Sequence, residues 1–262
     1  MINENDLFLA LRSIGLKPSD TVLIHGNAGV AAQFEGKCSE AKMQKLVQAI
    51  VEYFNDGTII VPAFTYSASR GHVFIAEETI SEIGMFSEYF RKFPGVQRSL
   101  HSMFSVSCIG YNANIYLNAN SYDCFGPDTV FDFLVCEDAK ILFLGCDLDK
   151  ATFVHHVEQA FQVPYRYNKS FDARIKTSQG VLKHKVNCYV RDLRLDPKLD
   201  LNNFQRLAIE TKKLFEGSIG RFSLKQISAQ NFYDLAIFML KENPFALVDI
   251  KGVENVNSET TG

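Results

Sequence analysis

The sequence contains no tryptophan, and it lacks the patterns of several protein classes. No apolar run approaches the roughly 20 residues that a membrane-spanning helix needs, so we expect no membrane partner. The first residues, MINENDLFLALRS, include early acidic side chains and lack the basic segment that opens a secretory signal peptide. We therefore expect a cytoplasmic protein.

Cysteine usage and charge exclude further classes. The six cysteines are scattered and none forms a CxxC pair, which argues against a zinc ribbon or a dithiol redox site. Scattered thiols suit a reducing compartment. The net charge of −3 over 262 residues argues against a nucleic-acid partner. With 47% hydrophobic residues, the chain can bury a sizeable core.

Signatures of common catalytic loops are also missing. Gly36-Lys37 lacks the earlier glycine and the following Ser or Thr of a phosphate-binding P-loop. There is no GxGxxG dinucleotide turn, no GxSxG nucleophile elbow and no HExxH zinc motif. Any catalytic activity must therefore depend on a different set of residues.

Short apolar runs alternating with amphipathic stretches predict an α/β fold, a layered αβα sandwich with a mostly parallel central sheet. The expected strands are Thr21–His25, Thr58–Val61, Phe104–Ile109 and Ile141–Leu144. The expected helices between them cover residues 6–14, 39–54, 84–93, 112–120 and 129–136.

The C-terminal part has a different pattern. Alternation in 171–177 and 181–191 around Ser178-Gln179-Gly180 predicts an antiparallel hairpin. Further on we expect helices over 201–215 and 224–241, with a short strand over 219–224 between them. We interpret residues 1–250 as a single domain, 164–195 as a hairpin subregion that receives substrate, and 251–262 as a loose tail.

The chain is organised around Ile141 to Ala160, in which a buried strand is followed by a short polar crossover and a helix. We expect that helix to start at or near Thr152, a natural N-cap residue. Thr152, His155 and Glu158 are three residues apart, so they form one stripe on its surface. An imidazole can move a proton near neutral pH, a carboxylate can orient it, and a hydroxyl can steady negative charge.

Two alternatives remain for this stripe. His155 can be a half-buried structural histidine, as we expect for His156, which points about 100° away on a helix. His155 and Glu158 could also share a zinc ion, but no third ligand is evident, so we predict no metal site.

Three other stretches are candidates for ligand contact. His25, Gly26 and Asn27 form a small-residue turn at the end of a strand, where a backbone can approach a ligand. A second stretch, which we expect to line a cleft, contains Phe64, Thr65 and Tyr66. The third crowds a cation and hydroxyls that suit phosphate or amide groups: Arg98, Ser99, His101 and Ser105. Ordinary surface loops are the alternative for each.

Taken in order, these stretches resemble the antibiotic N-acetyltransferase family, whose best-known members are aminoglycoside 3-N-acetyltransferases. The likeness covers about residues 5–240 and rests on pieces such as VLIHGNAG, GTIIVPAFTY, RSLHSMFSVSCIG, FGPDTVFDFL, KILFLG and TFVHHVE. The resemblance implies acyl transfer from a coenzyme A thioester to the amine of an amino sugar.

The resemblance also implies roles. His155 would be the general base, Glu158 its orienting partner and Thr152 a donor near the developing oxyanion. Coenzyme A would lie along His25, Gly26, Asn27, Arg98, Ser99, His101 and Ser105, and the acceptor near Phe64, Thr65 and Tyr66. The chain departs from the family pattern at Asn27, Ser102 and Ala151, where Ser, Pro and Asn are usual. These departures leave the coenzyme A contacts and the acyl group open.

The acceptor is inferred from charge. From Arg166 to Arg194 there are eight basic and two acidic residues, a local net charge of +6 in an acidic chain. This favours an anionic, nucleotide-linked amino sugar over a polycationic aminoglycoside. The alternatives are a free aminoglycoside, a solvated hairpin face without a ligand, and a non-catalytic protein that binds coenzyme A or sugar. A homodimer also stays open.

Overall fold

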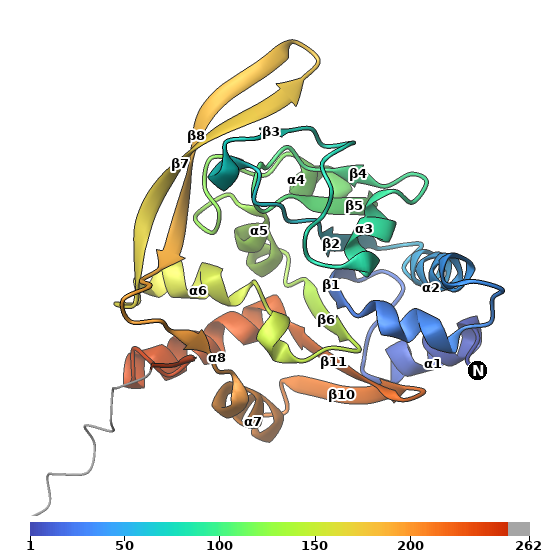
Figure 1. Cartoon of the computed structure of the whole chain (residues 1–262). Helices are drawn as coiled ribbons and strands as arrows, with labels where there is room; N and C mark the ends of the chain where they lie inside the picture. Colours follow the sequence, from blue (N-terminus) through green and yellow to red (C-terminus); the bar gives the residue numbers. More distant parts are fainter. Residues whose placement is uncertain (251–262) are drawn as a thin grey trace, which may run out of the picture.

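The computed structural model describes residues 1–250, so the predicted tail at 251–262 lies outside the described residues. A seven-stranded sheet crosses the molecule in the order β10-β11-β6-β1-β2-β5-β4 (Figure 1). Its strands are β1 (Thr21–Gly26), β2 (Thr58–Pro62), β4 (Gln97–Arg98), β5 (Val106–Gly110), β6 (Lys140–Leu144), β10 (Leu214–Ile219) and β11 (Phe222–Ser228).

The sheet is mixed, so the prediction of a mostly parallel sheet was wrong. Only the central strands β6, β1 and β2 run parallel to one another. β5 pairs antiparallel with β2, and β11 antiparallel with β6. Apolar runs report that a strand is buried on both faces, but they carry no information about its direction.

Helices cover both faces of the sheet, as the layered prediction requires. α1 (Glu4–Ser13), α2 (Ser39–Tyr53) and α3 (Met85–Arg91) pack on one face, with Val22 and Ile24 of β1. α5 (Val130–Cys136), α6 (Val154–Phe161) and α8 (Ala229–Glu242) pack on the other, with Leu23. Successive side chains of a strand point to opposite faces of the sheet, so a single apolar strand contributes residues to the hydrophobic cores on both sides.

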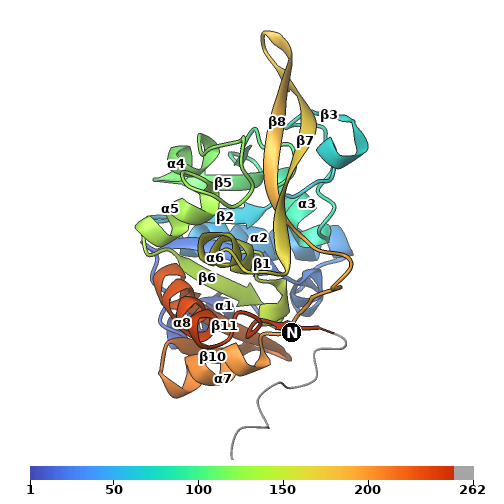
Figure 2. The ribbon, with the colours of Figure 1, turned by 90° about the vertical axis from the view of Figure 1, so that its left-hand side faces the viewer.

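The hairpin is longer than predicted. β7 (Arg166–Thr177) and β8 (Gly180–Arg191) pair along their whole length around a loop at residues 178–179. The short strand β3 (Val73–Phe74) adds to β7. Figures 1 and 2 show the outer half of the hairpin standing clear of the sheet and its base lying beside α6.

The predicted boundaries after residue 200 were partly wrong. α7 (Asn202–Glu210) ends before Leu214, and residues 214–219 form β10 rather than the end of a helix. Residues 224–228 belong to β11, because they pair with β6, and α8 begins only after Ser228, whose hydroxyl accepts a hydrogen bond from the Asn231 amide. Here pairing in the sheet overrides an amphipathic pattern that suits a helix.

Short elements complete the fold. α4 (Ala113–Leu117) is shorter than the predicted helix at 112–120. Within residues 1–250, three 3₁₀ turns lie in loops: η1 (Ala28–Gln33), η2 (Ala68–Arg70) and η3 (Leu148–Lys150). β9 (Lys198–Leu199) pairs with β12 (Val248–Asp249). Among the described residues, no helix is long and apolar enough to cross a membrane.

Candidate active site

The loop from β6 to α6 begins at Gly145, which has φ +71°. A Cβ at this position would lie 2.5 Å from a methyl carbon of Val30, so glycine is required on both backbone and packing grounds. η3 follows, and α6 begins at Val154 with Phe153 in the cap position. The helix therefore starts near Thr152, as predicted, although Phe153 rather than Thr152 occupies the cap position.

His155, the second residue of α6, is in direct contact with Glu158, three residues further along the helix. His155 Nδ1 is 2.7 Å from Glu158 Oε2, and the Glu158 side chain is completely buried, whereas about a quarter of the His155 side chain is exposed. The i, i+3 spacing that formed a stripe in the sequence thus produces a hydrogen-bonded pair.

Two residues outside the sequence motif surround this pair. The Tyr165 hydroxyl donates to Glu158 Oε1 at 2.9 Å. Arg166, the first residue of β7, places Nε 2.7 Å from Glu158 Oε2 and Nη2 2.8 Å from His155 Nδ1. The carboxylate is therefore held by an imidazole, a phenol and a guanidinium, which together compensate for its burial.

These contacts set the charge of both groups. Burial lowers the pKa of His155, and the positive charge of Arg166 lowers it further, while the hydrogen bond to Glu158 opposes the shift. Burial alone would raise the pKa of Glu158, but the contacts with His155, Arg166 and Tyr165 hold it below its usual value. At neutral pH the geometry thus favours a neutral imidazole against an ionised carboxylate, the state required of a general base.

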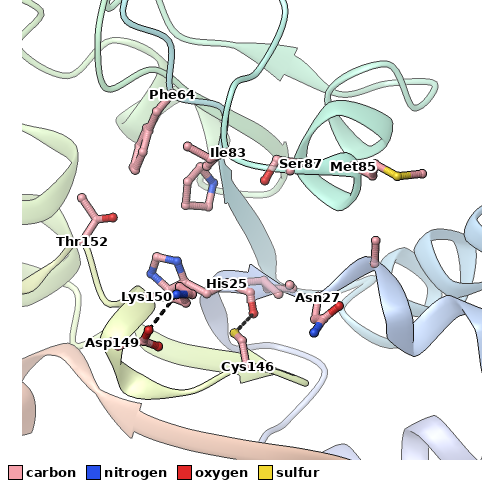
Figure 3. Close-up of a pocket in the computed structure, with 15 residues that line it drawn as sticks. His25, Asn27, Phe64, Ile83, Met85, Ser87, Cys146, Asp149, Lys150 and Thr152 are labelled. Atoms are coloured by element: carbon pink, nitrogen blue, oxygen red, sulfur yellow. Dashed lines mark hydrogen bonds and ion pairs between the residues drawn. The ribbon is translucent and has the colours of Figure 1, made fainter.

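A cavity of about 500 Å³ opens at the carboxyl ends of β1 and β2, beside the β6–α6 loop. Ligands commonly bind at this edge of α/β sheets. Five of the predicted site residues line it: His25, Gly26, Asn27, Phe64 and Thr152. Figure 3 shows Phe64 and Thr152 on one side of the cavity, with His25 and Asn27 along its floor.

His155 and Glu158 are not among the residues that line this cavity within the described chain. They lie on α6, whereas Thr152 lies in the loop before it, where the cavity meets the start of the helix. His156 faces another way: its Nδ1 is 2.7 Å from the Phe125 carbonyl oxygen, as expected of a structural histidine.

The small-residue turn is built from close contacts. A Cβ on Gly26 would lie 2.3 Å from the Phe86 ring, so only glycine fits. The Asn27 side chain donates to the Gly145 carbonyl at 3.0 Å and accepts from the Gly29 amide at 2.8 Å. This side chain thereby ties the β1 turn to the β6 turn on the cavity floor.

The predicted coenzyme A contacts at 98–105 do not reach the cavity. Arg98 donates to Ser105 Oγ at 3.0 Å and to the carbonyls of Ala63, Ala76 and Thr79. Ser99 Oγ accepts from the Val106 amide. These polar groups are already occupied within the protein, and their contact with coenzyme A stays a prediction that the geometry does not support.

His101 also has a structural environment. Its Nδ1 accepts from the amides of Met103 and Phe104, so the proton must lie on Nε2, which donates to the Asp123 carbonyl at 3.1 Å. Burial lowers the pKa of His101 to about 4. The ring is a neutral bridge between two loops.

Of the predicted acceptor residues, only Phe64 lines the cavity. Thr65 Oγ1 donates to Glu82 at 2.9 Å, and the Tyr66 amide donates to the same carboxylate. The Tyr66 ring is exposed and lies near Arg70.

Comparison with known proteins decides the family. Residues 23–241 match the family model described as aminoglycoside 3-N-acetyltransferase. The chain belongs to this family. It is 27% identical over 179 residues to the SPbeta prophage-derived aminoglycoside N(3')-acetyltransferase-like protein YokD of Bacillus subtilis strain 168. That match covers 60% of this chain and 64% of YokD, so the chain spans just under two thirds of this curated relative.

Solved structures of the aminoglycoside 3-N-acetyltransferase family share the fold. AAC-IIIb, described as binary with CoASH, has a TM-score of 0.77 at 18% identity and covers 92% of this chain and 97% of its own. Sisomicin-bound AAC-VIa has a TM-score of 0.77 at 18% identity and covers 92% and 98%. At this identity the likeness establishes the fold alone.

Three residues of the candidate site were not predicted from the sequence: Tyr165, Arg166 and Cys146. Arg166 was counted among the charges of the hairpin, although it is paired with Glu158. Cys146 lines the cavity and donates to the His25 carbonyl at 3.2 Å. Cys146 contacts a residue of another strand, and Tyr165 and Arg166 contact Glu158 across the connection from α6 to β7, so no helical or strand spacing within one element marked them. The described residues also contain no group of three or more His, Cys, Asp and Glu side chains that could hold a metal ion.

Proposed function

We propose that this protein is an acetyl-CoA-dependent N-acetyltransferase whose acceptor is an aminoglycoside-type amine. The observation that carries the proposal is the contact of 2.7 Å between His155 and the buried Glu158, in which His155 lies three residues after the cavity residue Thr152. Membership in the aminoglycoside 3-N-acetyltransferase family supports the reaction, and the CoASH-bound and sisomicin-bound relatives support the two ligands.

In this mechanism the acceptor first loses its ammonium proton to solvent, and the neutral amine attacks the thioester carbonyl carbon while His155 takes the proton that the nitrogen releases as the new carbon–nitrogen bond forms. The carbon–sulfur bond breaks, and the proton held on His155 passes to the leaving thiolate, so the enzyme returns to its starting state. Glu158 orients the imidazole and stabilises its charged form. The Thr152 hydroxyl is the donor for negative charge that develops on the thioester oxygen.

The alternative of a covalent acyl-cysteine finds no support in the site. Burial raises the pKa of Cys146 to about 12, so this cavity thiol stays protonated at neutral pH. A thiol rather than a thiolate is a poor nucleophile. Direct transfer to the amine therefore fits the residues better than a two-step route through the enzyme.

We propose that the acceptor extends from the first cavity into a neighbouring groove. This groove has a volume of about 990 Å³ and shares Gly84 and Met85 with the cavity. The charged residues that line this groove are Glu40, Glu82, Glu88 and Lys92. Arg70 pairs with Glu82, and Arg91 and Lys92 pair with Glu88, which leaves Glu40 to attract a cationic acceptor.

The nucleotide-linked acceptor that we inferred from charge loses its support. The residues lining the cavity, all within the described chain, include none from the hairpin. Lys183 and Lys185, two of the basic residues of this segment, are exposed. The basic segment is thus described better by the solvated-face alternative.

The test is amine-dependent release of the coenzyme A thiol from acetyl-CoA, with aminoglycosides, free amino sugars and nucleotide-linked amino sugars as acceptors. We expect turnover with aminoglycoside-type amines. Thermal stabilisation by coenzyme A without thiol release in any mixture would instead indicate a non-catalytic binding protein. Turnover only with nucleotide-linked amines would restore the anionic acceptor.

A further inference from the structure

Two groups compete for one nitrogen at the centre of the site. His155 Nδ1 lies 2.7 Å from the Glu158 carboxylate and 2.8 Å from Nη2 of Arg166. When Nδ1 carries a proton, it can donate to Glu158. When it does not, it can accept from Arg166, because a guanidinium has only donors. The two contacts are therefore alternatives, and each corresponds to a different position of the imidazole proton.

The choice decides whether the ring can act as a base. A neutral imidazole has a single proton. If Nδ1 donates to Glu158, then Nε2 has a free lone pair that can accept the proton of an amine. If Arg166 donates to Nδ1, then the proton lies on Nε2, and this nitrogen cannot accept another.

We propose that Arg166 is a positioning residue that controls the protonation of His155, both by competing for Nδ1 and by neutralising the charge of Glu158. The consequence for catalysis rests on the proposed acetyltransferase function. Arg166 itself does not touch the reacting atoms in this proposal. It acts through the imidazole.

The charges around His155 support this role. On α6 the near charge is Glu158, which is completely buried and would by itself draw a proton onto the ring. From the segment before β7 comes the Tyr165 hydroxyl, which is bound to Glu158. From the loop that carries Phe125, the carboxylate of Asp123 is occupied by Gln159 and by backbone amides. Arg166 thus supplies the cation that opposes Glu158.

The position of Arg166 is fixed from the hairpin. Its Nη1 donates to the Tyr189 carbonyl on β8 at 3.1 Å, while Nε and Nη2 reach α6. Figures 1 and 2 both show the base of the hairpin beside this helix. The guanidinium is held between two elements, so it cannot turn away from the imidazole without losing a bond on one side.

The test uses Arg166→Met, which removes the charge, and Arg166→Lys, which keeps a charge but loses the fork of N–H groups. Arg191→Met is the matched control, because Arg191 is the register partner of Arg166 at the same end of the hairpin and is largely exposed. The first measurement is an NMR titration of the ring nitrogens of His155 in the free protein. The second is the pH profile of kcat/KM.

In Arg166→Met we expect the pKa of His155 to rise by about one unit or more, the size of effect that a nearby charge produces. The acidic limb of kcat/KM should move to higher pH by the same amount, with little loss on the alkaline plateau. In Arg166→Lys the pKa should change less, while the nitrogen chemical shifts should show more proton on Nδ1. Arg191→Met should match the wild-type protein in both measurements.

Arg166 would be merely structural if Arg166→Met lowered kcat/KM equally at every pH and left the titration of His155 unchanged. Should Arg166→Met fail to fold, an unchanged balance of ring protons in Arg166→Lys would overturn the proposal by itself. Because the titration needs no substrate, a shifted pKa in a protein without turnover would support the role of Arg166 and overturn the enzymatic function instead.

Discussion

One ion pair joins α6 to the base of the hairpin, and another lies on the outer half of the hairpin, but the first is buried and the second is exposed to solvent. Glu158 and Arg166 are 2.7 Å apart, with 0% and 12% of their side chains exposed. Asp172 and Lys185 are 2.9 Å apart, with 88% and 69% exposed. Although the two distances are similar, we expect the loss of a partner to cost much more stability in the buried pair. A buried charge depends on its partner, whereas an exposed charge is stabilised by water.

The alternation of side chains along the hairpin strands explains why the charged residues face solvent. Along β7 and β8, the buried residues Ala173, Ile175 and Val186 alternate with exposed Arg174 and Lys185. A strand side chain can serve only one face, so the charges that remain lie on the face away from the body. A high local charge in the sequence thus marks a solvated surface here, and the single cation that enters the site is the one at the base, Arg166.

The sharpest difference between the regions should appear in turnover. We expect His155→Ala to lower kcat by about 10²- to 10⁴-fold with little change in KM, because the general base is lost. The measurement is amine-dependent thiol release, with His156→Ala as the control on the same helix. Near-normal turnover in His155→Ala, with loss in His156→Ala, would mean that the other imidazole is the base.

The buried pair should also dominate stability. Glu158→Gln leaves the Arg166 guanidinium without its counter-charge, and we expect a loss of about 3–5 kcal/mol in the free energy of unfolding. Asp172→Asn breaks the exposed pair and should cost less than about 1 kcal/mol. Both values can be measured by urea denaturation, and equal losses would contradict the comparison.

A similar argument applies to Arg98, whose guanidinium is bound to three carbonyls and Ser105. We expect Arg98→Met to lower the free energy of unfolding by about 1.5–3 kcal/mol or more, as for hydrogen bonds to charged groups. The KM for acetyl-CoA should stay near its wild-type value. A raised KM with unchanged stability would instead make Arg98 a coenzyme A contact.

Acid should destabilise the fold through buried imidazoles. Burial lowers the pKa of His25 and of His101 to about 4, from an unfolded value near 6.5. Between pH 6.5 and 4 the unfolded chain binds more protons, so stability must fall as pH falls, by up to about 1.4 kcal/mol per group and pH unit. Urea denaturation at pH 7 and pH 5 tests this, and equal stabilities would contradict it.

The smallest effect should come from the exposed charges of the hairpin. Lys183→Glu should change kcat/KM by less than about twofold for any acceptor at physiological salt, where exposed charges are screened within about 8 Å. Kinetics at low and physiological salt, with aminoglycosides and nucleotide-linked amino sugars, provide the measurement. A selective loss with the nucleotide-linked acceptor would place this face in the substrate path after all.

The features predicted correctly from the sequence are those set by near neighbours. The run at 141–144 is completely buried, as continuous apolar strands must be when helices cover both faces. The spacing of His155 and Glu158 predicted their contact because three residues nearly complete one helical turn. The turn at Gly26 was likewise visible as a small-residue stretch at a strand end.

The features predicted wrongly, or not at all, depend on distant partners. The direction of β5 and β11 follows from which strands they pair with, and no local pattern encodes that choice. The local pattern of residues 214–215 suited a helix, but in the structure they pair with β11 and form a strand. Arg98 looked like an anion site because its carbonyl partners at Ala63, Ala76 and Thr79 come from other loops. Arg166 contacts Glu158 and His155 across the connection from α6 to β7, so no spacing within one element marked it.

The exposed edge of the hairpin bears on the solubility of the protein. β8 is the last strand of its sheet, so the backbone of its outer half presents an edge to which another extended chain could add. Lysines on such an edge oppose edge-to-edge pairing, since an incoming copy would bring like charges together. Lys183 and Lys185 lie at this position. Their charge thus protects each molecule from joining its neighbours into a continuous sheet, and this protection weakens as salt concentration rises.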